Sequence, residues 1–343
     1  MLIKNISALL GPELNFTQST NIQIQKNIFK RIQSNIKPSG KEETIDCEGL
    51  LLIPGFINAH THIADSIGKD VTLNSSVDKR IHPVFGAKSK ILKNTSHENL
   101  ANFMKNTCHS MIQKGITTFV DFREGGTDGV LLLKKVLSDV PIRSIILGRI
   151  EFYNDTAEIR KNSPFPKEKI AELTTLLQKS DGIGISGANE NSTSVLNHYS
   201  KTTKLRVIHS SETKQSVSKS KKITGKSETI RSLFLKPHFL IHMTHASQGD
   251  LFATAKKTRG IVICPRANAS LAEGIPDIEL MQKAGCTLAL GTDNVMINSP
   301  DMFREMDFLW KVTMGLHKKR ISPKEILKMA TVNGGKILKK NIG

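Results

Sequence analysis

The sequence lacks the features that mark membrane proteins, secreted proteins and disulfide-stabilised proteins. No apolar run approaches the ~18 residues of a membrane span, and no hydrophobic signal region follows Met1. The four cysteines are scattered without a C-x-x-C pair, which excludes a disulfide framework and a Cys-rich zinc ribbon. With 38% hydrophobic and 23% charged residues, the composition is that of a globular protein. We therefore expect a cytoplasmic protein that has no membrane contact.

Aromatic residues are also scarce, and this scarcity bears on the strongly basic charge. The formal net charge is +18, a value that invites a nucleic-acid or anionic-membrane partner. However, the chain has one Trp and two Tyr, and its lysines are spread along the sequence without interleaved aromatics for base stacking. The charge therefore gives nucleic-acid binding only weak support, and we expect a small-molecule substrate as the partner.

The order of apolar segments indicates an α/β fold. Residues 1–51 alternate short apolar stretches with turn residues and predict an N-terminal β-strand segment. In residues 52–343, short apolar runs alternate with segments of helical periodicity, which is typical of βα units. No G-x-G-x-x-G follows the first run, so the pattern favours a (β/α)8 TIM-type barrel over a doubly wound, dinucleotide-binding sheet. The predicted strands are 52–59, 117–121, 142–147, 182–186, 205–209, 239–242, 261–264 and 287–291.

Residues that bind metals follow several of these predicted strands. His60 and His62 lie at the end of the first strand, His209 at the end of the fifth and Asp293 just after the eighth. Active sites of such barrels lie at the C-terminal strand ends, and alternate strand residues point to the same side. A lone histidine there is more often a satisfied polar group, but ligand types at three strand ends together favour a metal site. Three imidazoles and a carboxylate suit one divalent ion, Zn²⁺ or Fe²⁺.

Other polar residues would surround this metal. Glu212 follows the fifth strand and His242 ends the sixth; either residue could be structural, but their position favours proton transfer. Three arginines at or beyond strand ends could bind an anionic group of the substrate: Arg123, Arg149 and Arg266. Alternatively, these arginines pair with nearby carboxylates, namely Glu124, Glu151 and Glu273, or lie solvated at the rim. The long segment 63–93 after the first strand is a candidate lid.

Several motifs resemble the amidohydrolase superfamily and, within it, the deaminase branch of cytosine, guanine and adenosine-type deaminases and triazine chlorohydrolases. Residues 54–62 read PGFINAHTH and resemble the strand-1 signature, and residues 209–212 read HSSE and resemble the His-x-x-Glu of that branch. The later motifs follow in the family's order: IHMTH at 241–245, CPRAN at 264–268, LGTD at 290–293 and ATVNG at 330–334. The resemblance covers nearly the whole chain.

The resemblance implies a mononuclear metal site and a set of catalytic roles. The implied ligands are the four residues named above, and residues 182–187 (GIGISG) lack the lysine of dinuclear members. Asp293 would accept a proton from the metal-activated water, Glu212 would protonate the ring nitrogen, and His242, rather than His245, would orient the hydroxide or polarise the oxyanion. Asn268 of the CPRAN motif joins the arginines as a candidate substrate contact.

Two points stay open at this stage. Relatives usually continue into further strands that complete a small β-sandwich, so residues 1–51 are expected to be incomplete, with an unpaired edge that favours homo-oligomers. The leading hypothesis for function is hydrolytic deamination of an aminoheterocycle. The alternatives are hydrolysis of a cyclic amide or of another C–N or C–halogen bond at the same site, and a non-catalytic basic binding protein.

Overall fold

The computed structural model describes residues 1–316, 318 and 320–340, so the end of the predicted barrel domain, residues 341–343, lies outside the described residues. The chain divides into two compact units, Met1–Gly55 and Phe56–Gly343. The division follows Pro54, which has no N–H to donate to a strand ladder. Leu51 and Leu52 accordingly pair with a strand of the first unit. The predicted first barrel strand, 52–59, is therefore wrong at both ends, because the strand runs from Phe56 to His62.

The first unit is a five-stranded sheet. Its strands are β1 (Leu2–Leu10), β2 (Asn15–Gln25), β3 (Ile28–Gln33), β4 (Thr44–Asp46) and β5 (Leu51–Leu52). β1 pairs antiparallel with β2 and parallel with β4 and β5. The hairpin between β2 and β3 turns at Lys26 and Asn27, whose φ angles of 51° and 62° suit the two-residue turn that matches strand twist. Completion of this sheet by further strands or by a second protomer stays a prediction.

The second unit is a barrel of parallel strands, and this confirms the predicted fold class. Its strands are β6 (Phe56–His62), β7 (Ile116–Arg123), β8 (Arg143–Gly148), β9 (Gly182–Ile185), β10 (Leu205–Ser210), β11 (Phe239–His242), β12 (Ile261–Ile263), β13 (Leu288–Leu290) and β14 (Asp293–Asn294). They lie in the order β13-β12-β11-β10-β9-β8-β7-β6-β14. Since β13 and β14 are successive pieces of the eighth strand, the pairing of β14 with β6 closes the sheet into a barrel.

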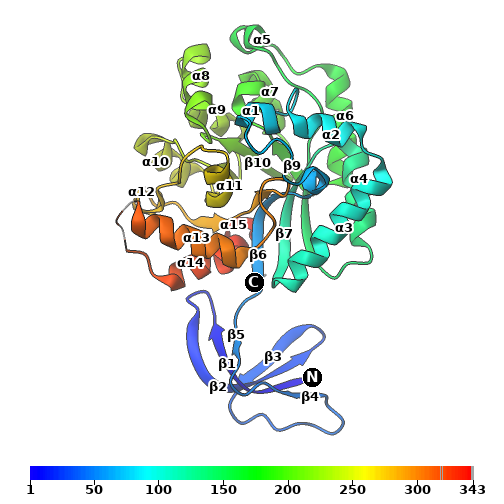
Figure 1. Ribbon diagram of the computed structural model, residues 1–343, viewed down its shortest axis with the longest axis vertical. Helices are drawn as coiled ribbons and strands as arrows, with labels where there is room; N and C mark the ends of the chain where they lie inside the picture. Colours follow the sequence, from blue (N-terminus) through cyan, green and yellow to red (C-terminus); the bar gives the residue numbers. More distant parts are fainter. Residues whose placement is uncertain (317, 319, 341–343) are drawn as a thin grey trace. The chain divides into compact units, whose positions relative to one another are not determined.

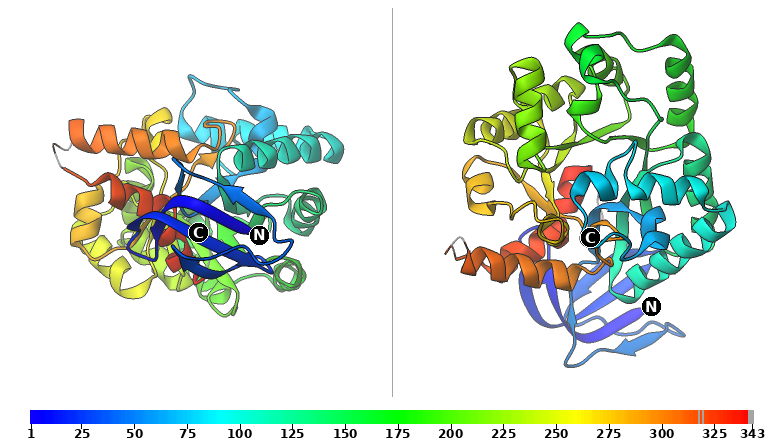
Figure 2. Two further views of the ribbon diagram at one scale, coloured as in Figure 1. Left: turned by 90° about the horizontal axis from the view of Figure 1, so that it is seen from below. Right: turned by 45° about the horizontal axis from the view of Figure 1, so that its top comes forward.

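Helices surround these strands (Figures 1 and 2). They are α3 (His97–Gln113), α4 (Gly126–Leu137), α5 (Thr156–Lys161), α6 (Lys167–Lys179), α7 (Thr193–Tyr199), α8 (Lys214–Thr224), α9 (Glu228–Ser232), α10 (Gln248–Lys257), α11 (Pro265–Ser270), α12 (Ile278–Lys283), α13 (Met302–Gly315), α14 (Pro323–Ala330) and α15 (Val332–Leu338). α15 packs closely on β6, because a Cβ at Gly334 would lie only 2.9 Å from Cγ2 of Ile57. Within the described residues, no helix combines the length and apolarity needed to cross a bilayer.

The segment after the first barrel strand forms short helices at the C-terminal ends of the strands. These are the 3-10 helix η1 (Ile63–Gly68), α1 (Val77–Ile81) and α2 (Ala87–Asn94). Val77 and Ile81 of α1 pack against Met296, which lies in the loop after β14. The segment is therefore held across part of the barrel mouth, where it contributes residues to the pocket described below.

Candidate metal centre and active site

Four side chains from three barrel strands meet at the C-terminal end of the barrel. His60 and His62 come from β6, His209 from β10 and Asp293 from β14, and each offers one ligand atom within 4.8 Å of the others. Nε2 of His60 lies 3.2 Å from Oδ1 of Asp293 and 3.1 Å from Nε2 of His209. All four residues are buried. The predicted ligand set is therefore brought together in space.

The sequence between β13 and β14 allows this close approach. A Cβ at Gly291 would lie 2.7 Å from the Cβ of His60, so only glycine fits beside β6 at this position. Next to it, Thr292 and Asn58 bond to each other twice: the Thr292 N–H donates to Oδ1 of Asn58 (3.0 Å), and Nδ2 of Asn58 donates to the Thr292 hydroxyl (2.7 Å). These contacts join β6 to the chain just before β14, and they fix Asp293 beside His60.

Hydrogen bonds on the outer ring nitrogens orient two of the histidines. Nδ1 of His209 lies 3.1 Å from the carbonyl oxygen of Ile185, and Nδ1 of His62 lies 2.8 Å from Oε1 of Glu124. An N–H at each Nδ1 would donate to these oxygens and leave the Nε2 lone pair facing the centre. This is the tautomer that binds a metal through Nε2.

Burial and neighbouring charges set the protonation states at the centre. Burial lowers the pKa of His60 to about 3 and lowers the pKa of His209 well below its usual value, so both imidazoles are neutral. Burial alone would raise the pKa of Asp293, but the hydrogen bond with Nε2 of His60 lowers it. The buried Oδ2 of Asp293 has no hydrogen-bond partner among the described residues. Neutral imidazoles and a carboxylate with a spare oxygen fit a divalent cation.

The residues predicted to transfer protons lie next to these ligands. Oε2 of Glu212 is 3.6 Å from Nε2 of His242, and both residues have a ligand-type atom within 4.8 Å of Asp293. Burial raises the pKa of Glu212. Oε1 of Glu212 and both ring nitrogens of His242 have no hydrogen-bond partner within the described part of the chain. Such unpaired buried groups are rare in folded proteins and point to a ligand or a catalytic role.

The backbone around this cluster adopts conformations that are uncommon outside glycine. Ser211, His242 and Asp293 have φ angles of 51°, 70° and 61°. Left-handed conformations of this kind cost free energy and are concentrated at functional sites. The other histidine of the IHMTH motif, His245, does not belong to this cluster. Its Nε2 lies 2.6 Å from the carbonyl oxygen of Glu273.

The cluster opens into a pocket of about 790 Å³, which the mouth segment helps to line. His62, His209, Glu212, His242 and Asp293 form its metal-facing side. A second cavity adjoins it and is lined by apolar residues, such as Leu100 and Met104, as well as by charged ones, such as Glu124. The two cavities share the lining residues Ile81, Pro83, Lys88 and Arg149. A substrate could therefore extend from the metal-facing pocket into the second cavity.

The candidate substrate contacts lie at different distances from this pocket. Arg149 lines both cavities, whereas Arg123 lines only the second one and pairs with Oε2 of Glu124 at 2.8 Å. Arg266 lies on α11 outside both linings, with its guanidinium 3.5 Å from Glu305. Asn268 is buried on the same helix, outside both linings, and its amide has no partner among the described residues. Substrate roles for these four residues stay predictions.

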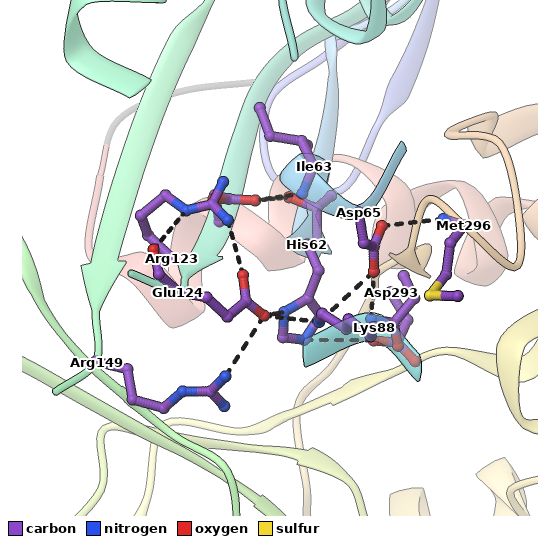
Figure 3. A network of polar contacts seen from close by, with 12 residues as sticks. His62, Ile63, Asp65, Lys88, Arg123, Glu124, Arg149, Asp293 and Met296 are labelled. Atoms are coloured by element: carbon purple, nitrogen blue, oxygen red, sulfur yellow. Dashed lines mark hydrogen bonds and ion pairs between the residues drawn. The ribbon is translucent and has the colours of Figure 1, made fainter. Parts of the chain in front are cut away.

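One group of supporting residues was missed by the sequence reasoning (Figure 3). Oε1 of Glu124 lies 2.6 Å from Nζ of Lys88 and 3.5 Å from a guanidinium nitrogen of Arg149. The same carboxylate also contacts His62 and Arg123. Glu124 directly follows the C-terminal end of β7, and this position could have marked it as a site residue. Lys88 carries no comparable signal, because it comes from a helix inside the predicted lid segment.

Comparisons with known proteins indicate the family to which this chain belongs. The family model described as "Amidohydrolase family" matches residues 51–343. A Methanothermobacter thermautotrophicus protein, provisionally named an aminohydrolase, is 37% identical over 341 residues, which cover 97% of this chain and 85% of that protein. A 5-methylthioadenosine/S-adenosylhomocysteine deaminase of Thermoanaerobacter pseudethanolicus is 31% identical over 360 residues, with coverage of 98% and 80%.

Solved structures show the same fold. The atrazine chlorohydrolase of Arthrobacter aurescens in complex with zinc has a TM-score of 0.82 at 15% identity, and the match covers 99% of this chain and 83% of that one. At this identity the likeness concerns the fold alone. The family match and the 37% and 31% identities over nearly the whole chain carry the assignment. The chain therefore belongs to the amidohydrolase family, as its motifs indicated, and the predicted enzyme class, a hydrolase of non-peptide carbon–nitrogen bonds, is confirmed with it.

Proposed function

We propose that this protein catalyses the hydrolytic deamination of an aminoheterocycle, such as a nucleobase or nucleoside, with one divalent cation at His60, His62, His209 and Asp293. Zn²⁺ is the proposed ion and Fe²⁺ is the alternative, since both accept imidazole and carboxylate ligands. The convergence of Glu212, His242 and Asp293 in the same pocket is the observation that carries the proposal. Relatives named as deaminases support it.

The side chains divide the chemistry between them. When bound, the cation makes water acidic enough to supply hydroxide near neutral pH. The free Oδ2 of Asp293 accepts the proton of the attacking water and then gives it to the amino group, which leaves as ammonia when the C–N bond breaks. Burial raises the pKa of Glu212 and so favours its protonated form, which gives its proton to the ring nitrogen beside the attacked carbon. The added hydroxyl returns its proton to Glu212 as the carbonyl of the product forms. His242 faces the oxyanion that develops at that carbon, and a donor at this place stabilises it strongly in a dry site.

The pocket also suggests features of the substrate. Arg149, which lines both cavities, would receive a carboxylate or phosphate group of the substrate. The second cavity would accept a substituent that the reaction does not change. Together these features favour an aminoheterocycle with a polar or anionic arm over a free nucleobase.

Ammonia release by Zn²⁺- or Fe²⁺-loaded protein tests the proposal. The panel contains cytosine, guanine, adenosine, 5-methylthioadenosine, S-adenosylhomocysteine and an aminopurine nucleotide. We expect metal-dependent release from at least one compound, and we expect Glu212→Gln to keep its metal while kcat falls by about 10²–10⁴-fold. If wild-type protein with one bound ion releases ammonia from none of them, another hydrolysis, such as that of a cyclic amide, replaces deamination as the proposed reaction.

A further inference from the structure

A single buried lysine joins the supports of two different metal ligands. Lys88 lies on α2 in the mouth segment, and its side chain is only 6% exposed. Its Nζ is 2.6 Å from Oε1 of Glu124 and 3.5 Å from Oδ2 of Asp65 (Figure 3). Lysine is rarely buried to this extent, because a charged ammonium out of water requires opposite charges around it.

The first carboxylate supports a ligand on β6. The Oε1 atom of Glu124 that contacts Lys88 also lies 2.8 Å from Nδ1 of His62. A carboxylate in this position fixes the ring and its tautomer, so that Nε2 of His62 faces the metal. The ammonium of Lys88 contacts this same oxygen.

The second carboxylate supports the turn that carries Asp293. Oδ2 of Asp65 accepts a hydrogen bond from Nδ2 of Asn294 (2.7 Å), and Oδ1 accepts one from the backbone N–H of Met296 (2.9 Å). These bonds fix the chain directly after Asp293, whose own backbone is left-handed. Lys88 therefore lies between the support of a first-strand ligand and the support of the last-strand ligand.

We propose that Lys88 is a positioning residue that holds His62 and Asp293 together in metal-binding geometry. This inference rests on the proposed metal site but not on the identity of the substrate. Without the ammonium, Glu124 would keep Arg123 and Arg149 as cationic partners, but Asp65 would lose the cation 3.5 Å away, and the link between the two supports would be lost. Through Lys88, the packing of α2 at the barrel mouth sets the affinity for the metal.

Metal binding by three variants of α2 tests this role. Lys88→Met removes the charge and keeps the length of the stem, Lys88→Arg keeps the charge, and Lys90→Met changes an exposed lysine of the same helix. Dissociation constants for Zn²⁺ come from chelator competition at fixed pH, and Co²⁺ absorption spectra report ligand geometry. We expect Lys88→Met to weaken metal binding by about 10–100-fold and to alter the Co²⁺ spectrum. Lys88→Arg should recover part of the affinity, and Lys90→Met should match wild type.

Other outcomes separate this proposal from its competitors. Lys88 also lines the pocket, so a direct substrate contact would raise KM and leave metal affinity unchanged; that result would overturn the positioning role. If Lys88→Met does not fold, Lys88→Gln takes its place, and wild-type metal affinity in that variant would overturn the role equally. Failure of wild-type protein to bind any metal would instead refute the proposed function.

Discussion

Two glutamates, the half-buried Glu124 and the buried Glu228, support different sides of the pocket, and their surroundings differ. Glu124 lies behind the metal ligand His62, where burial would raise its pKa but Lys88 and other cations hold it well below its usual range. Glu228 lies behind the turn that carries Glu212. Among the described residues, its hydrogen bonds come from neutral donors, the N–H of Ser211 (3.0 Å) and a serine hydroxyl. Burial raises the pKa of Glu228 to about 7.

This difference divides the pocket into two halves. The metal-holding half contains His60, His62, His209 and Asp293, and the proton-transfer half contains Glu212 and His242. On the metal side, the charge of Glu124 is compensated by neighbouring cations, and the outer nitrogens of His62 and His209 have partners. Among the ligands, Nδ1 of His60 and Oδ2 of Asp293 have none within the described part of the chain. On the other side, atoms of Glu212 and His242 stay without partners among the described residues. Ligands that hydrogen bonds already hold in place do not have to reorganise when the metal binds. The unpaired atoms of Glu212 and His242 remain available to a reacting substrate.

Replacing a metal ligand should break the site completely. In His209→Gln we expect metal content to fall from one ion toward zero and turnover to fall by at least about 10³-fold, because hydroxide is no longer supplied near neutral pH. Elemental analysis of dialysed protein and the ammonia assay measure both effects. A variant that keeps one ion with normal turnover would show that His209 is not a ligand.

Replacing a residue of the proton-transfer half should separate chemistry from metal binding. His242→Gln should keep one bound ion while kcat falls by about 10²–10³-fold, the range for loss of one oxyanion donor. Metal content and kcat, measured on the same preparation, give the comparison with His209→Gln. Loss of the ion from His242→Gln would place this histidine among the ligands and remove the distinction between the two halves.

The sequence predicts the strands and the metal ligands better than the side chains that support them. Apolar runs locate the strands, and ligand residues at strand ends locate the metal site, because parallel strands of a barrel bring their C-terminal ends together. Side-chain partners that come from distant segments are not visible in the pattern. Arg266 was expected to pair with Glu273 or to face the substrate, yet its partner is Glu305, 39 residues away on α13. Lys88 reaches Glu124 only because the mouth segment folds back over β7.

The raised pKa of Glu228 predicts a pH-dependent stability. The folded-state pKa of about 7 lies above the ordinary value of 4.5, so the folded state holds this proton more tightly. The resulting stabilisation is complete below about pH 4.5, declines as pH rises toward 7 and is absent above it. Its full size is about 3 kcal/mol. Glu228→Gln, which keeps an acceptor for Ser211, should therefore lose less stability than wild type between pH 5 and pH 8.

Urea unfolding of both proteins at the two pH values measures this difference. Titrating groups that do not interact with Glu228 contribute equally to wild type and variant, so the difference between their two pH-dependent changes reports on Glu228 and on its interactions with Glu190 and Glu212. Identical changes in the two proteins would mean that Glu228 is ionised in the folded state like Glu124, and the contrast between the two glutamates would disappear.

The smallest expected effect concerns metal affinity and compares the two glutamates directly. Glu124→Gln replaces a charge that orients His62 with a neutral amide and leaves Lys88 without its nearest carboxylate, so zinc binding should weaken by about 10–100-fold. Glu228→Gln changes no group in contact with a metal ligand and should bind zinc like wild type. Chelator competition at one pH measures both variants. Equal weakening in the two would show that general loosening of the pocket, rather than orientation of His62, sets the affinity for the metal.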